Sequence, residues 1–235
     1  MTVSTQNQFF RCLAGMAFLL AIFPSLARAA VIYDNGSYNP ANYVAQFSEG
    51  NYRVADDFSL SSPDTIRSTQ FWGVYWSSGV IPATETFTAV VYGDLPGRPD
   101  SGNVIGSSNL SLVSRLDTGF DHNGVPGANI LEFNMNLDSP IFVPTTGVYW
   151  FSIFHSDEPG TQFAWQETGL DGASNKVQSS DFGVTWPSAG GGETAFNLSN
   201  SYVSPVPLPA ALPLFLTMLG GMGFLKWRRG KRQAA

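Results

Sequence analysis

Turn-forming residues interrupt the central part of the chain so often that no helix of ordinary length fits between them. Clusters of Gly, Pro, Asn, Asp and Ser recur from Asp34 to Gly192, and one of the longest covers Asp94 to Gly102. Such clusters mark turns and loops. The chain contains 24 Gly and 15 Pro without a collagen period, and 14% of its residues are aromatic. This pattern predicts an all-β fold.

The segments between the turns have the pattern of β-strands. From Leu131 to Asp138 apolar and polar residues alternate without a fault, which places one face on a core and the other in water. Residues 149–154 are apolar on both faces, so we expect them in the middle of a sheet. Further strands are expected at 69–76, 86–92, 162–168 and 193–198. About ten short strands predict two packed antiparallel sheets, a jelly-roll or Greek-key sandwich.

The first 29 residues have the pattern of a secretory signal peptide. Arg11 precedes an apolar run from Cys12 to Leu26, and Ala27-Arg28-Ala29 follows as a small-x-small cleavage sequence. The run is too short to span a bilayer comfortably, although an uncleaved membrane anchor is the alternative. We expect a signal helix that is removed after Ala29 together with Cys12, the only cysteine. The exported protein would then rely on its core rather than on disulfides.

The last part of the chain has the pattern of a membrane-spanning helix. Residues 208–225 carry no charge, and as a helix they would extend about 27 Å, close to the hydrocarbon thickness of a bilayer. A buried core helix is the alternative, but it would show a polar face. Basic residues follow, and by the positive-inside rule they keep this end in the cytoplasm and everything upstream outside. They are Lys226, Arg228, Arg229, Lys231 and Arg232.

This region resembles a known sorting signal. It contains, in order, Val206-Pro207-Leu208-Pro209-Ala210, an apolar stretch with three glycines, and the basic tail. The order and spacing resemble the PEP-CTERM sorting signal, in the version that has Leu where the name-giving motif has Glu. The resemblance covers residues 205–235. Pro207 and Pro209 keep the junction extended and prevent the helix from running upstream, which suits a protease at the membrane.

The resemblance implies an exported protein of a Gram-negative bacterium that produces exopolysaccharide. It implies three partners: the secretion translocon, signal peptidase, and an exosortase, a membrane-bound transpeptidase-like cysteine protease that cleaves near the two prolines. The membrane helix would then be a temporary anchor. We therefore expect a signal peptide (1–29), an acidic β-sandwich domain (30–204) and a sorting signal (205–235).

The body between the two ends is strongly acidic. All 18 Asp and Glu lie between Asp34 and Glu193, where only five Lys and Arg occur. A body of this charge repels phosphate backbones, which argues against nucleic acid as a partner.

The body lacks the motifs of common enzymes. Its histidines, His122 and His155, are far apart, and no nucleophile elbow, zinc-protease or nucleotide-binding motif is present. We therefore expect no catalysis. A glycosidase needs only two carboxylates, so a secreted carbohydrate-active enzyme is the alternative. The acids on or beside expected strands are Glu132, Asp157, Glu158 and Glu167.

Two kinds of binding site are candidates. Asp117, Asp121 and Asn123 share a Gly-containing loop whose oxygens suit Ca²⁺, and a Ca²⁺-stabilised adhesin is a further alternative. The loop lacks an acid at position 119 and a distal Glu, so an Asx-rich turn is the favoured explanation. Exposed indoles can form a glycan-binding platform, although core packing is the common role of Trp. The candidates are Trp72, Trp76, Trp165 and Trp186. We expect no cofactor and a non-catalytic cell-surface or matrix protein that contacts exopolysaccharide.

Overall fold

The computed structural model describes residues 30–39, 44–76, 81–156, 162–168, 176–187 and 191–204. The expected signal peptide, with Ala27 and Ala29, lies outside these ranges, and so does the expected sorting signal with its prolines and basic tail. Within the described ranges, no helix is long and apolar enough to cross a membrane.

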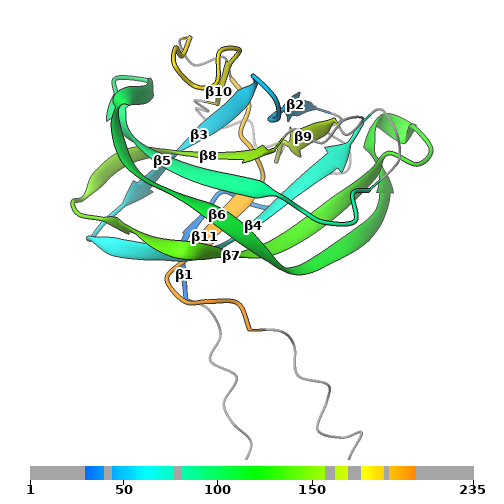
Figure 1. The fold of residues 1–235 in the computed structure, drawn as a ribbon, viewed down its shortest axis with the longest axis horizontal. Helices are drawn as coiled ribbons and strands as arrows, with labels where there is room; N and C mark the ends of the chain where they lie inside the picture. The colour runs from blue at the N-terminus through cyan, green and yellow to red at the C-terminus, as the bar shows by residue number, and fades with distance from the viewer. Residues whose placement is uncertain are drawn as a thin grey trace, which may run out of the picture.

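The described residues form one antiparallel sheet of eleven strands (Figure 1). The prediction of an all-β antiparallel domain is confirmed, and a short 3₁₀ turn, η1 (His122–Gly124), accompanies the strands. The strands are β1 (Val31–Asp34), β2 (Ala45–Phe47), β3 (Arg53–Leu60), β4 (Asp64–Tyr75), β5 (Phe87–Leu95), β6 (Arg98–Asp121), β7 (Asn129–Val143), β8 (Gly147–His155), β9 (Phe163–Gln166), β10 (Val177–Ser179) and β11 (Phe196–Ser199).

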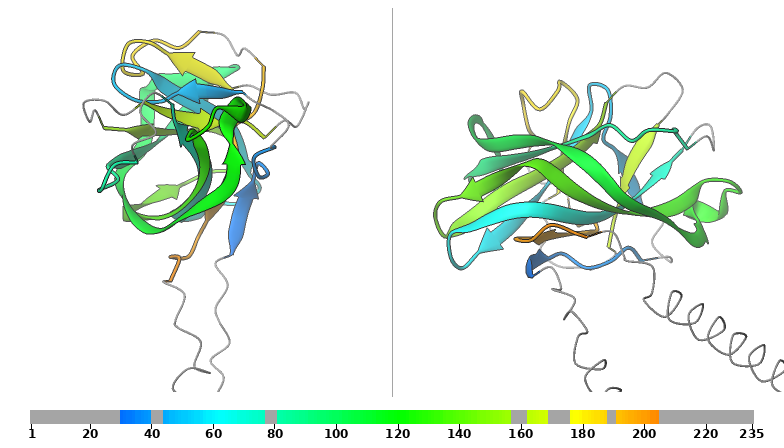
Figure 2. Two further views of the ribbon diagram at one scale, coloured as in Figure 1. Left: turned by 90° about the vertical axis from the view of Figure 1, so that its right-hand side faces the viewer. Right: turned by 60° about the horizontal axis from the view of Figure 1, so that its bottom comes forward.

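Short connections require this sheet to curl. The order across it is β1-β11-β4-β7-β6-β5-β8-β3-β10, and β9 pairs with both β4 and β2. β3 and β4 are far apart in this order, yet only residues 61–63 join them. β7 and β8 are likewise separated by β6 and β5 and joined by residues 144–146. The strand ends can meet only if the sheet folds over on itself, as the end-on view in Figure 2 shows.

The long strand β6 joins the two halves of the curl. Its first part, as far as Leu110, pairs with β5, and its second part, from Leu110 to Asp121, pairs with β7. One half therefore contains β11, β4 and β7, and the other contains β5, β8 and β3. The two sheets expected from the sequence are halves of one continuous sheet, which face each other across a common core.

Aromatic side chains fill the space between the halves. Phe71 stacks on Phe133 with ring centroids 5.0 Å apart, and Phe87 meets Phe163 edge to face at 4.8 Å. All four rings are buried in the main core. A Cβ atom on Gly73 would lie 2.3 Å from the Phe163 ring. The glycine therefore makes room for Phe163 to enter the core.

The strongest strand predictions hold in the structure. On β7, Leu131, Phe133, Met135 and Leu137 are buried and the residues between them are half-buried. β8 pairs with β3 on one side and β5 on the other, so residues 149–154 are central as expected. The turn expected from Asp94 to Gly102 is wrong in extent, since β6 begins at Arg98.

Candidate functional site

Polar side chains face the inside of the curl at one end of the sheet. On β6, Arg115 and Asp117 lie directly opposite Phe133 and Leu131 of β7. Directly opposed residues share a face of the sheet, and both partners belong to the main core. Arg115 and Asp117 therefore point inward. We call this end of the curled sheet the mouth, and its residues are Tyr75, Trp76, Ile81, Glu85, Arg115, Asp117, Gly127 and Asn129.

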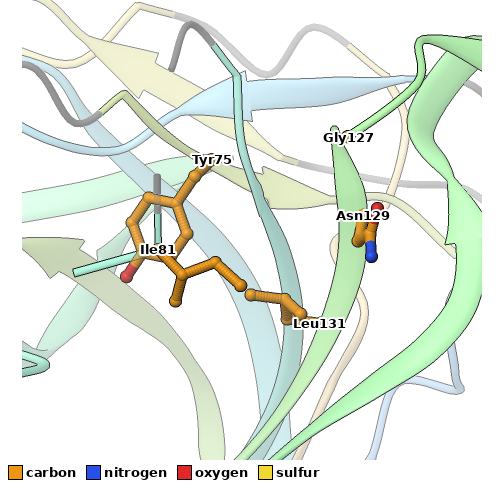
Figure 3. Close-up of a pocket in the computed structure, with 5 residues that line it drawn as sticks. All are labelled: Tyr75, Ile81, Gly127, Asn129 and Leu131. Atoms are coloured by element: carbon orange, nitrogen blue, oxygen red, sulfur yellow. The ribbon is translucent and has the colours of Figure 1, made fainter. Parts of the chain in front are cut away.

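A small cavity opens in the mouth (Figure 3). It has a volume of about 180 Å³, and Tyr75, Ile81, Gly127, Asn129 and Leu131 line it. Figure 3 shows the Tyr75 ring and the Ile81 side chain on one side and Leu131 and Asn129 on the other. The wall therefore combines apolar side chains with the polar groups of Tyr75 and Asn129. The cavity is smaller than pockets that bury drug-sized ligands, which measure about 300–1,000 Å³.

A buried carboxylate lies behind the cavity. The Glu85 side chain is only 1% exposed, and it forms an ion pair with Arg115. The Tyr75 hydroxyl donates a hydrogen bond to the same carboxylate. Burial, followed by the charge of Glu85, raises the pKa of Tyr75 well above its usual range. Because Tyr75 stays protonated and Glu85 is paired, this group positions the wall of the mouth.

The candidate calcium loop lies at the edge of the mouth. Asp117 accepts hydrogen bonds from the Gly119 backbone N–H at 2.8 Å and from the Asn129 side chain. Asp121 and Asn123 are exposed, and Asn123 has a left-handed φ of 54°. In the ranges that the structure covers, no group of three or more His, Cys, Asp or Glu could hold a metal ion. One Asp117 oxygen accepts within the turn, as in an Asx turn, and the other accepts from Asn129 at the start of β7.

Three of the four candidate tryptophans are buried. Trp165 is in the main core and donates to the Ala195 carbonyl at 3.1 Å. Trp72 packs with Ile130 and Ala195 on the outer face, and Trp186 packs in another cluster near Tyr92. These three cannot present a face to a polymer.

Trp76 is the exception. It is 39% exposed and directly follows Tyr75 at the end of β4, so its side chain lies on the outer side of the strand, as that of Trp72 does. Its ring meets the His122 ring edge to face, with centroids 4.8 Å apart. The His122 backbone N–H in turn donates to the Ala128 carbonyl at 2.8 Å, next to Gly127 of the cavity wall. Trp76 is therefore held on the outer side of the sheet, at the strand end that carries Tyr75, with part of its surface open to solvent.

The carboxylates considered for a glycosidase do not meet in the structure. Glu132 is bonded to Gln70 and Asn134 and faces away from the core. Glu167 is buried in an ion pair with Lys176. Asp157 and Glu158 lie outside the described residues. Glu132 and Glu167 therefore do not face each other across an open cleft.

A second polar cluster closes the curl at another place, and we call it the clasp. Its residues are Asn35, Asp56, Glu167, Lys176 and Thr194. Asp56 is fully buried on β3, where it points inward like Val54 and Phe58. Its Oδ2 accepts hydrogen bonds from the Thr194 backbone N–H, from the Thr194 hydroxyl at 2.9 Å and from the Asn35 amide at 3.2 Å. The clasp therefore connects β3 to the segments next to β1 and β11.

Burial changes the titration of the clasp. It raises the pKa of Asp56 to about 7, although the hydrogen bonds from Thr194 oppose the shift. It lowers the pKa of Lys176 to about 8, against the opposite effect of the Asp56 charge. Both changes reflect the cost of holding a charge away from water.

The sequence did not point to Glu85, Arg115 or Asn129, or to Asp56. Glu85 precedes β5, Arg115 is within a polar strand, and Asn129 begins β7. No local motif connects them, and only the curl of the sheet brings them together. Asp56 was visible as one of two adjacent acids, and the apolar neighbours Val54 and Phe58 at alternating positions were the available signal.

Comparison with known proteins adds no family assignment: neither the scan against protein-family models nor the search of curated proteins gives a match.

Proposed function

We propose that this chain is an exported, non-catalytic protein of the cell surface or matrix, directed there by its two ends. The support is the sequence pattern: a signal peptide ending at Ala29, and a Pro-x-Pro motif, apolar stretch and basic tail like those of exosortase substrates. The proposal treats the curled sheet as a jelly-roll-like sandwich between a signal helix and a membrane helix.

The position of the two ends of the domain agrees with this role. The Asn200 backbone N–H donates to the Ala30 carbonyl at 3.1 Å, so the domain begins and ends at one place. Near its end, the Val203 backbone N–H and carbonyl both bond to the Asn136 side chain on β7, at 2.8 and 3.0 Å. Asn136 is seven positions along β7 from Asn129 of the mouth, which is about 23 Å for an extended strand. The last described residues are therefore attached to β7 well away from the mouth.

We further propose that the mouth binds one sugar residue of an exopolysaccharide. The observation that carries this proposal is the half-exposed Trp76, whose side chain lies on the outer side of the strand end that carries Tyr75 of the cavity wall. Sugar rings stack on such indoles through their apolar C–H face. The Asn129 amide of the cavity wall and the Asp117 carboxylate, bonded to each other, supply polar groups on the inner side. Because the cavity is small, a polymer would lie across the rim and insert a single residue or substituent.

The proposal can be tested with the exported protein recovered from producing cells. We expect it to cosediment with purified exopolysaccharide from the same cells, and we expect Trp76→Ala to weaken this binding about tenfold, as loss of about 1.4 kcal/mol of stacking would. Phe142→Ala is the matched control, because Phe142 is 58% exposed near the far end of β7. Equal binding by the Trp76 and Phe142 variants, or no retention on any polymer, would exclude the mouth as the site.

A further inference from the structure

The clasp contains an unusual lysine. Lys176 is the only lysine between residues 30 and 204, and its side chain is 3% exposed. Lysine is almost never fully buried unless it is paired. Its Nζ is in direct contact with Oε1 of Glu167, which is itself only 6% exposed. An amine and a carboxyl group are thus held together away from water.

The surrounding chain shields this pair from solvent. A Cβ atom added to Gly192 would lie 2.9 Å from both the Lys176 Nζ and a Glu167 oxygen, so the glycine backbone covers the pair closely. Glu167 also forms a β-bridge with Thr194, which fixes its backbone. Three segments that contact one another therefore hold the Lys176 amine and the Glu167 carboxyl group in place. They are 167–168, 176–177 and 191–195.

Burial favours the neutral forms of both groups. A buried ion pair loses the hydration of both charges, and proton transfer from the ammonium to the carboxylate removes that cost. The lowered pKa of Lys176 is consistent with this direction. The raised pKa of Asp56 also means that this neighbour is largely protonated below pH 7 and then contributes no counter-charge to Lys176.

We infer that Lys176 and Glu167 join through an intramolecular amide bond in the folded protein. The neutral Lys176 Nζ attacks Cδ of the Glu167 carboxylic acid, and an N–C bond forms. The C–O bond to the hydroxyl group breaks, and the hydroxyl leaves with one proton from the nitrogen as water. The products are a secondary amide and one water molecule, and no oxidant, metal or cofactor is consumed.

Two physical effects favour this reaction in the clasp. Fixed contact between the amine and the carboxyl group replaces a bimolecular encounter, which raises the effective concentration by several orders of magnitude. Release of the product water from a site that excludes solvent opposes hydrolysis. The bond would also tie β9 to β10 in an exported chain whose only cysteine, Cys12, precedes the body. It would act as a covalent link where a disulfide is not available.

Peptide mapping tests the inference directly. Trypsin cleaves after Lys and Arg, and Lys176 is the only such site between Arg115 and Lys226. After denaturation of the full chain, an ordinary ion pair dissociates and trypsin cuts at Lys176. The amide blocks this cut, so we expect a peptide spanning 116–226 that is lighter than its sequence by one water. Digestion at Glu should likewise fail after Glu167 and, because the bond between Glu158 and Pro159 resists cleavage, give a peptide spanning 133–193 with the same loss.

Lys176→Arg is the matched control, because Arg preserves the charge and the trypsin site and its guanidinium is a poor nucleophile at neutral pH. This variant should be cut after residue 176 with no loss of water. Complete tryptic cleavage of the wild-type chain after Lys176, at full mass, would overturn the inference. The result is independent of polysaccharide binding, since the mouth takes no part in it.

Discussion

The mouth and the clasp contain similar chemical groups in opposite surroundings. Each has an inward-facing acid, a cation and a side-chain amide: Asp117, Arg115 and Asn129 in the mouth, and Asp56, Lys176 and Asn35 in the clasp. In the mouth, Asp117 and Trp76 are exposed. In the clasp, Asp56 and Lys176 are buried.

The two regions therefore differ in solvent access and not in residue type, and only the polar groups of the mouth keep contact with water. Polar groups that keep contact with water can exchange that water for a ligand at little cost to the fold. Polar groups sealed from water must satisfy one another, and each then stabilises the fold strongly. The comparison leads to three predictions about stability.

The largest expected effect is that of Asp56→Ala. It removes the acceptor of three buried hydrogen bonds, from two Thr194 groups and from Asn35. Leaving such donors unsatisfied should lower the free energy of unfolding by about 3 kcal/mol. Asp117→Ala in the mouth should cost less than about 1 kcal/mol, because water can replace the lost acceptor. Urea denaturation of both variants measures the difference, and equal losses would remove the distinction between the two regions.

A smaller effect is expected from two glycine substitutions. Gly192 and Gly119 both have positive φ, at 88° and 77°, so Ala introduces backbone strain of about 1 kcal/mol at either position. A Cβ on Gly192 also meets Lys176 and Glu167 at 2.9 Å, whereas a Cβ on Gly119 meets nothing within 4 Å. Gly192→Ala should therefore be less stable than Gly119→Ala by about 1–2 kcal/mol in the same assay. A reversed order would mean that the clasp is loosely packed.

The third prediction concerns the change in the free energy of unfolding that the titration of Asp56 causes. Measured per pH unit, this is the smallest expected effect. Its pKa is raised in the folded state from 3.8 to about 7, so the folded protein binds the proton more tightly than the unfolded chain. The Asp56 contribution to stability is therefore fully present below about pH 4 and is lost as the pH rises to about 7, by at most about 1.4 kcal/mol per unit. Asp56→Asn should flatten this slope. Parallel pH profiles of wild type and Asp56→Asn would contradict the shift.

The fold class was predictable because its signal is local. The alternation from Leu131 to Asp138 and the apolar run 149–154 identify β7 and β8 without knowledge of their partners. β6 was the main omission among the strands. Its residues 98–109 are mostly Gly, Ser, Asn and Asp and mostly exposed, so neither propensity nor periodicity marks them. Pairing with β5 and β7 decides their conformation.

The candidate site was much less predictable. Trp72 and Trp76 occupy the same side of β4 by alternation, yet one is buried beneath Tyr38 and Ala195 and the other is exposed. The difference comes from segments distant in the sequence that cover only Trp72. In the same way, Glu85 and Arg115 form an ion pair only because β5 and β6 are adjacent in the curl.

The amino-acid sequence by itself determined the class of fold, the acidity of the body and the targeting signals expected at its two ends. Each of these depends on residues that are neighbours along the chain. The tertiary structure decided which acids, cations and indoles are sealed and which meet water. The physical reason is that burial depends on which strands the curled sheet brings face to face, and short connections such as residues 61–63 and 144–146 fix that arrangement.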